Sequence, residues 1–217
     1  MDSNVEAFRF NTKLDQTILL GRKARNVDEL LECLKVVPES SVYFHTHRFL
    51  QQHHYLSPEP PNDFAYWITN VVNDVELGEQ VSSVDIVQFQ SVSDLRDRFT
   101  EIIDAYLRSA GTIVDCPRGE EFHFMASRTF VLATPYTACS LGEFKENLQR
   151  VSTASLYYHM FDAKLRLGKG ENDFSRWFEH LGEHTLAEEV TRLDPYTYTL
   201  ESLRNKIVRL MEEHDKH

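Results

Sequence analysis

Two histidines could do chemistry, because each lies in the same local sequence at two places in the chain. His45 follows Ser-Val-Tyr-Phe and His159 follows Ser-Leu-Tyr-Tyr, and an Asn-Asp-Phe-x-x-Trp motif comes after each of them. A histidine beside a carboxylate can act as a general base or bind a polar ligand. We therefore predict that His45 pairs with Asp63 and that His159 pairs with Asp173. The alternative is a structural hydrogen bond that ties two helices together.

Aromatic and basic residues near these pairs extend the candidate binding sites. Trp67 and Trp177 lie one helical turn after the phenylalanine of each motif and could form the floor of a pocket, although aromatic residues at this spacing also build cores. Arg96 and Arg204 occupy matched positions early in two expected helices, where a positive charge opposes the helix dipole. We expect an intramolecular carboxylate to hold each arginine, with Asp63 and Asp173 as candidates, and an anionic ligand is the alternative.

A histidine-rich stretch occurs only in the first half, in HTHRFLQQHH. Imidazole is a common ligand of zinc and iron, so His45, His47, His53 and His54 are candidate metal ligands. The stretch lacks the HxxxH spacing that lets two histidines chelate one ion from one helix face. We predict no cofactor, and a transition metal is the alternative that these four residues leave open.

The same motifs recur because the chain contains an internal repeat. With a shift of 114 residues, 10 of the 41 positions in 8–48 are identical to those in 122–162. After a shift of four residues in the register, the two tryptophans of the chain align with each other. The same motifs in the same order predict a tandem duplication. The predicted modules are residues 1–107 and 122–217, and the Gly- and Pro-containing segment 108–121 is the predicted linker.

The elements that must position these residues are mainly helical. Each copy opens with aromatic and β-branched residues (FRF and TILL, then FHF and TFVLA), which predict a short hairpin in each. Hydrophobic spacing and capping residues predict helices over 27–37, 41–53, 77–84, 92–107, 141–151, 155–167, 186–192 and 200–214, and a further helix from each Asn-Asp-Phe-x-x-Trp motif. Ser155 is the expected cap of one of them. The predicted fold class is α+β, predominantly α-helical: a tandem pseudo-two-fold repeat of a helical module with a short β-hairpin.

Composition narrows the classes of function. The 217 residues carry a net charge of −11, and a surface of this sign repels phosphate backbones, so we expect no nucleic-acid partner. No apolar run approaches the length of a membrane-spanning helix, and the N-terminus does not resemble a secretory signal. Three cysteines without a CxxC pair indicate free thiols in the cytoplasm. The sequence does not indicate an oligomeric state.

The repeated motifs resemble a small module of bacteria and archaea that belongs to the families of unknown function. The resemblance rests on the Glu-Leu and Glu-Phe steps, the aromatic-His pair, Asn-Asp-Phe-x-x-Trp, and the later Leu-Gly and Leu-Ala steps. It covers nearly the whole chain, once in each copy. The second copy departs from the pattern at Ser175, where alanine is more typical. Because the family has no established activity, the resemblance implies no catalytic residues.

Three functions compete on this evidence. The first is a non-enzymatic interaction or regulatory protein that binds a protein partner or a small polar ligand in a groove formed by the duplicated modules. The second is a metal-binding protein or metal-dependent enzyme that uses the histidines of the first copy. The third is a small-molecule sensor, for example of a sugar. No P-loop, GxGxxG, GxSxG, HExxH or EF-hand motif occurs, which favours the first hypothesis.

Overall fold

The protein has a mixed α+β fold that is about 60% helical with a two-stranded antiparallel sheet. The computed structural model describes residues 6–52, 62–109, 113–167, 171–193 and 198–214. At this level the predicted fold class is confirmed. Among the described residues, no helix combines the length and the apolar character that crossing a membrane requires.

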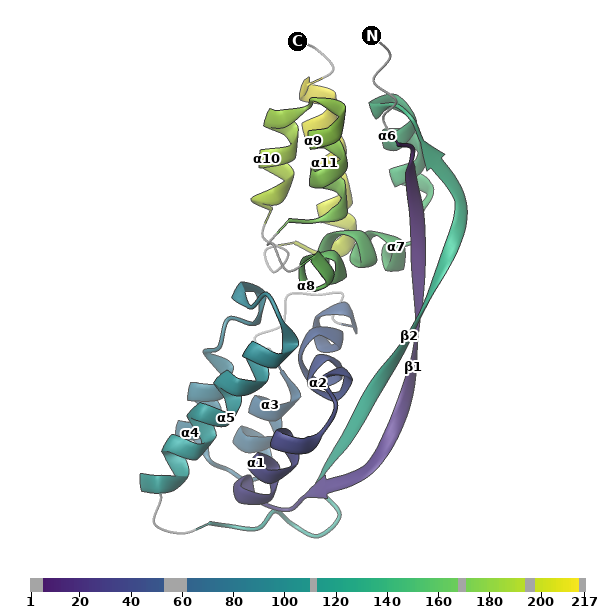
Figure 1. The fold of residues 1–217 in the computed structure, drawn as a ribbon. Helices are drawn as coiled ribbons and strands as arrows, with labels where there is room; N and C mark the ends of the chain where they lie inside the picture. The colour runs from purple at the N-terminus through teal and green to yellow at the C-terminus, as the bar shows by residue number, and fades with distance from the viewer. Residues whose placement is uncertain (1–5, 53–61, 110–112, 168–170, 194–197, 215–217) are drawn as a thin grey trace. The chain divides into compact units, whose positions relative to one another are not determined.

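The sheet consists of two long strands, β1 (Phe8–Ala24) and β2 (Phe122–Ala138), which pair with each other (Figure 1). The prediction of a short hairpin inside each copy is therefore wrong. The polar residues between FRF and TILL were interpreted as a turn, but they continue one strand of 17 residues. Pairing with a strand more than 100 positions away supplies their backbone hydrogen bonds, and local sequence carries no sign of such a partner.

The described residues divide into two compact units, and each strand contributes to both. Unit 1 contains 6–14 and 129–214, and unit 2 contains 15–52 and 62–128, within the described ranges. The first half of β1 thus belongs with the helices of the second sequence copy. The first half of β2 belongs with the helices of the first copy. The compact units therefore differ from the predicted modules, which follow the sequence in one piece each.

The predicted linker is partly built into unit 2. Its first residues extend the helix α5, which runs to Ser109. Further on, the Cys116 N–H donates to the Arg25 carbonyl (2.6 Å), and the Asn26 side chain donates to Asp115 (2.6 Å). These bonds fix the segment that leads into β2 against the end of β1.

The helices of unit 2 begin where capping side chains accept free backbone N–H groups. Asn26, Asn62 and Asp74 each accept from the residue three positions on, and Ser91 accepts from Asp94. The elements are α1 (Val27–Val36), α2 (Glu39–Gln52), α3 (Asp63–Asn70), α4 (Val75–Ser82), a short 3-10 helix (Ile86–Gln88) and α5 (Val92–Ser109).

The helices of unit 1 follow the same order, with one irregularity. They are α6 (Leu141–Arg150), α7 (Thr153–Tyr157), a π-helical turn (Tyr158–Asp162), α8 (Ala163–Leu167), α9 (Asp173–Leu181), α10 (His184–Thr191) and α11 (Leu200–His214). The prediction that Ser155 caps α7 is wrong. Ser152 is the cap, and Ser155 lies inside the helix with its hydroxyl free for another role.

Aromatic side chains from the strands complete the core of each unit. Phe8 and Phe10 of β1 are buried in unit 1 against Phe144, Phe174 and Trp177. In unit 2, Phe122 and Phe124 of β2 pack in the same way around the ring of the α3 phenylalanine. Full burial of one such side chain contributes about 1.5–3 kcal/mol, so the helices of each unit depend on a strand from the other sequence copy.

Candidate functional site

The predicted pairing of His45 with Asp63 is confirmed in unit 2. The His45 Nδ1 atom lies 2.8 Å from Asp63 Oδ2, and the side chain is almost fully buried. The other ring nitrogen, Nε2, accepts a hydrogen bond from the backbone N–H of Met125 in β2 at 3.0 Å. His45 therefore connects α3 to the strand rather than facing an open pocket.

A serine one turn earlier on the same helix completes this contact. The Ser41 hydroxyl donates to the carbonyl oxygen of Met125 at 2.7 Å. Residues four positions apart share one face of a helix, so Ser41 and His45 together satisfy both backbone groups of Met125. We call Ser41, His45 and Asp63 the unit 2 clamp.

Unit 1 contains an equivalent set of contacts, which we call the unit 1 clamp. His159 Nδ1 lies 2.8 Å from Asp173 Oδ2, which confirms the second predicted pair. His159 Nε2 accepts from the Asn11 N–H of β1 at 2.8 Å, and the Ser155 hydroxyl donates to the Asn11 carbonyl at 2.6 Å. The hydroxyl that was predicted to cap a helix holds a strand instead.

These bonds determine which ring nitrogen carries the proton. An Nε2 atom that accepts from a backbone N–H must present its lone pair, so the proton lies on Nδ1 and is donated to the carboxylate. Neither His45 nor His159 then has a free lone pair for a substrate proton or a metal ion. The geometry supports the structural alternative that the sequence left open for this pair.

The two tryptophans also bind the backbone next to the strands, through their indole N–H groups. The Trp67 indole N–H donates to the Glu120 carbonyl (2.8 Å), just before β2 begins. The Trp177 indole N–H donates to the Glu6 carbonyl (2.9 Å), just before β1. Both rings are buried, so the predicted pocket floor is part of the core.

The expected intramolecular carboxylate is confirmed for Arg204, and it is Glu201 on the same helix. Arg204 donates through Nη1 to the carbonyl oxygens of Leu148 and Gln149, both at 3.1 Å, and its Nε lies 3.2 Å from Glu201. The last carbonyls of α6 lack partners within that helix, so Arg204 caps the end of α6. The buried Nε of Arg96 has no hydrogen-bond partner in the described part of the chain.

Of the four histidines predicted as candidate metal ligands, His45 is excluded by its hydrogen bonds. Both ring nitrogens of His45 are occupied, and His47 stacks on Tyr43 with its Nδ1 2.9 Å from the Thr46 hydroxyl. His53 and His54 lie outside the described residues. Within the described ranges, no three His, Cys, Asp or Glu side chains gather in a way that could hold a metal ion.

Comparison with known proteins assigns the chain to a family. A model of DUF5752, a family of unknown function, matches residues 5–212. The chain belongs to this family. It is similar to the solved structure of OrfY from Thermoproteus tenax, with 28% sequence identity and a TM-score of 0.81, and the alignment covers 98% of this chain and 97% of that chain. A comparison with curated proteins finds no match.

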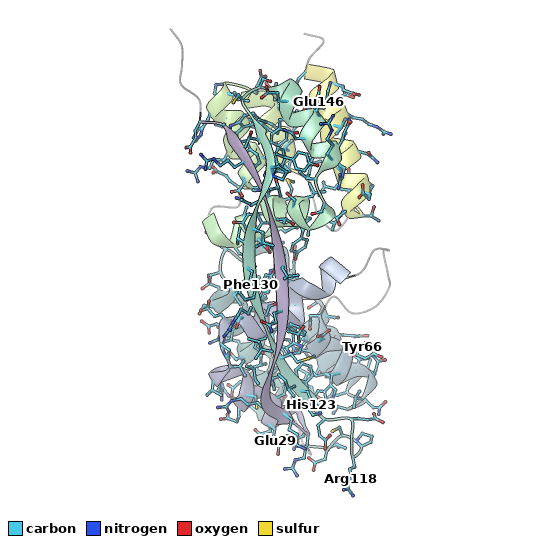
Figure 2. The ribbon with its side chains drawn as sticks, turned by 90° about the vertical axis from the view of Figure 1, so that its right-hand side faces the viewer. Glu29, Tyr66, Arg118, His123, Phe130 and Glu146 are labelled. Atoms are coloured by element: carbon cyan, nitrogen blue, oxygen red, sulfur yellow. The ribbon has the colours of Figure 1, made fainter. Side chains whose placement is uncertain are left out.

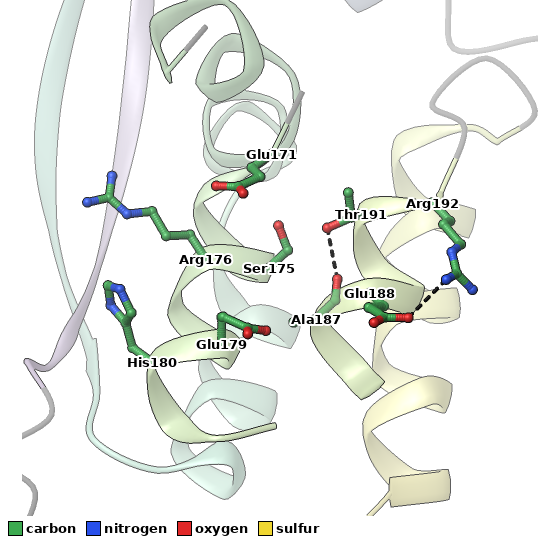
Figure 3. A pocket seen from close by; sticks show the side chains of 9 residues that line it. All are labelled: Glu171, Ser175, Arg176, Glu179, His180, Ala187, Glu188, Thr191 and Arg192. Carbon is green, nitrogen blue, oxygen red and sulfur yellow. Dashed lines mark hydrogen bonds and ion pairs between the residues drawn. The ribbon is translucent and has the colours of Figure 1, made fainter. Parts of the chain in front are cut away.

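Unit 1 has a groove of about 490 Å³ between α9 and α10 (Figure 3). Arg176 and His180 point away from the side where Arg192 forms an ion pair with Glu188 (2.9 Å). Ser175 also lines the groove, and its hydroxyl is part of the capping box of α9. The groove therefore carries charges of both signs and no nucleophile with a neighbouring base.

A buried ion pair in unit 1 was not predicted from the sequence. The Lys13 ammonium of β1 lies 2.7 Å from Asp162 and 4.7 Å from the centre of the Tyr157 ring. The π-helical turn thus supplies two side chains that bind β1, those of His159 and Asp162. The copies differ here, because position 13 aligns with Ser127, so the repeat gave no signal for the pair.

The clamp serines could have been identified from the sequence. Ser41 and His45, like Ser155 and His159, are four residues apart within the most similar part of the repeat. That spacing places a hydroxyl and an imidazole on one helix face. The strand that they bind could not be predicted, because it comes from the other copy.

Proposed function

We propose that this protein is a non-enzymatic binding or regulatory protein that engages a protein partner through its two-stranded sheet. The observation that carries the proposal is a set of exposed apolar side chains on both strands in unit 1: Leu14 of β1, and Phe130, Val131 and Leu132 of β2, where successive side chains point to opposite faces of the sheet. They are between 44% and 60% exposed, and Figure 2 labels Phe130 on β2. We call these four residues the ribbon patch. Large apolar side chains that are exposed together are typical of interaction sites.

The patch favours a partner that supplies an extended apolar segment. Each strand of the described sheet has one strand neighbour, so its other edge presents backbone N–H and C=O groups. Near Asn11 the unit 1 clamp occupies such groups, whereas the ribbon patch lies further along both strands. An added strand would pair with the backbone and cover the apolar side chains.

The use of the histidines supports a non-enzymatic function. The residues that suggested general-base chemistry in the sequence are bound to backbone groups and carboxylates inside each unit. The polar chemistry shared by the two copies therefore serves to attach the strands.

We further propose that the two sequence copies arose by duplication, with the modules 1–107 and 122–217 exchanging their first strand segments. The matched clamps support this interpretation, because the same residue types make the same bonds in both units. We place the protein in the cytoplasm, which its three free cysteines favour.

Site-specific photo-crosslinking in the native host tests the proposed function. A benzoylphenylalanine at position 130 should crosslink to one protein, and the same group at Val36, a more exposed apolar position on α1, should not. The purified partner should then bind in calorimetry and lose affinity at least about ten-fold for the Phe130→Ser/Leu132→Ser variant. Equal crosslinking at both positions, or unchanged affinity of the variant, contradicts the proposal.

A further inference from the structure

Unit 2 contains a second groove of about 420 Å³, lined by both apolar and polar side chains, which no function described so far uses. It lies at the turn between α3 and α4, beside the end of α5 and the segment that follows it. Its lining residues are Val27, Val72, Asn73, Asp74, Val75, Glu76, Tyr106, Leu107, Ile113 and Val114. Three of them, Val75, Ile113 and Val114, are between 48% and 58% exposed. Single exposed apolar residues need no explanation, but three that line one groove point to a ligand with an apolar body.

The charged side chains that line this groove are all acidic. The carboxylates of Asp74 and Glu76 line it, and no lysine, arginine or histidine does so among the described residues. Asp74 accepts the Leu77 N–H (3.1 Å) and the Tyr106 hydroxyl. The hydrogen bond to Asp74 is the main cause that raises the pKa of Tyr106 to about 12, so the phenol adds no charge to the groove near neutral pH.

We propose that this groove binds a small organic cation, a protonated amine on an apolar chain. The chain would cover Val75, Ile113 and Val114, and the ammonium group would lie beside Glu76 and Asp74. The volume lies within the range of small-molecule sites, which is about 300–1,000 Å³. This site is independent of the ribbon patch, which lies on other residues and in unit 1.

The groove of unit 1 provides a matched comparison within the same chain. It has a similar volume, but Arg176 and Arg192 contribute positive charge to its lining. An amine that is attracted only by exposed carboxylates would also bind near Glu179 and Glu188 there. Selective binding in unit 2 therefore rests on its negative charge, which no basic side chain among the described lining residues opposes.

Nuclear magnetic resonance titration of the full-length protein tests the proposal with n-hexylammonium, and with hexanoate and hexan-1-ol as matched probes. We expect saturable shifts of the Val75 and Val114 signals with hexylammonium, and binding at least about ten-fold weaker with hexanoate because its charge is repelled. Hexan-1-ol should fall between the two.

Two variants separate charge from apolar contact. Glu76→Gln should weaken hexylammonium binding about three-fold, the size expected for one exposed charge, and Val114→Ser should weaken all three probes. Glu188→Gln in unit 1 is the control and should leave binding unchanged, and unchanged spectra elsewhere show that each variant is folded. The proposal is overturned by equal affinity for hexylammonium and hexanoate, by shifts centred on unit 1, or by no saturable shift at all.

Discussion

Replacement of His45 by phenylalanine tests the clamp interpretation directly, because the new ring fills a similar volume but cannot form hydrogen bonds. The change removes the donor to Asp63 and leaves the Met125 N–H without its acceptor. A hydrogen bond to a charged group contributes about 1.5–3 kcal/mol, and an unpaired buried N–H costs about 1–3 kcal/mol. The Asp63 side chain is 35% exposed, so water can replace the lost donor and the first contribution falls to its lower end. We expect the free energy of unfolding of unit 2 to fall by about 2.5–4.5 kcal/mol.

The assay uses the two tryptophans of the chain, one in each unit, as separate reporters. Trp67 belongs to unit 2 and Trp177 to unit 1, so 5-fluorotryptophan labelling gives one fluorine signal for each. In urea, His45→Phe should shift the Trp67 transition to lower concentration more than the Trp177 transition. His159→Phe should have the reverse effect.

His123→Phe is the matched control, because this histidine also lies on β2 but is exposed. It should change the free energy of unfolding by no more than about 0.5 kcal/mol. The clamp interpretation is refuted if His45→Phe behaves like His123→Phe. It is also refuted if nitrogen chemical shifts show that the His45 proton lies on Nε2, since that atom could not then accept the Met125 N–H.

Three further predictions concern other parts of the chain. The pKa of Tyr106 is raised in the folded state to about 12, so its hydrogen bond contributes stability that is complete below pH 10 and is lost as the pH rises through 12; ultraviolet titration of Tyr106→Phe against the parent protein should show one phenol fewer in this late range. Cys139 is exposed, whereas burial raises the pKa of Cys33 and Cys116, so a maleimide at pH 7 should label Cys139 first, and equal rates by mass spectrometry would contradict this. Proteolytic cleavage at a site introduced within 110–112 should leave the two fragments associated in gel filtration until denaturant is added, because each unit contains segments from both fragments. Separation of the fragments in buffer would contradict this.

Local sequence predicted most of the helices, because several of them follow a residue whose side chain is a typical N-cap. Asn26, Asn62, Ser140 and Asn172 all accept backbone N–H groups as expected, and the helices after them begin at the predicted residues. The strands were predicted less well. Their polar central residues suggest turns, and only a partner strand that is distant in sequence makes them extended.

The candidate site was predicted as a set of residues but not as a function. Both His–Asp pairs form at 2.8 Å, as the repeat indicated. Their second partners are backbone N–H groups of the strands, and a backbone group carries no sequence signal. For the same reason the sequence predicted a carboxylate partner for Arg204, which Glu201 supplies, but not the carbonyl oxygens at the end of α6.

This outcome changes where function should be sought in a chain whose sequence contains an internal repeat. Residues that are identical in both copies must satisfy a requirement that both copies share, and here that requirement is the attachment of a strand with a Phe-x-Phe core segment. Residues in which the copies differ are free of it. Glu76 and Tyr106, which line the unit 2 groove, align with Thr185 and His214. In unit 1, His214 pairs with Glu189 at 3.1 Å instead of lining an acidic groove. Identity between the copies therefore identifies the residues that build the fold, and the differences between them identify the surface on which a specific ligand can bind.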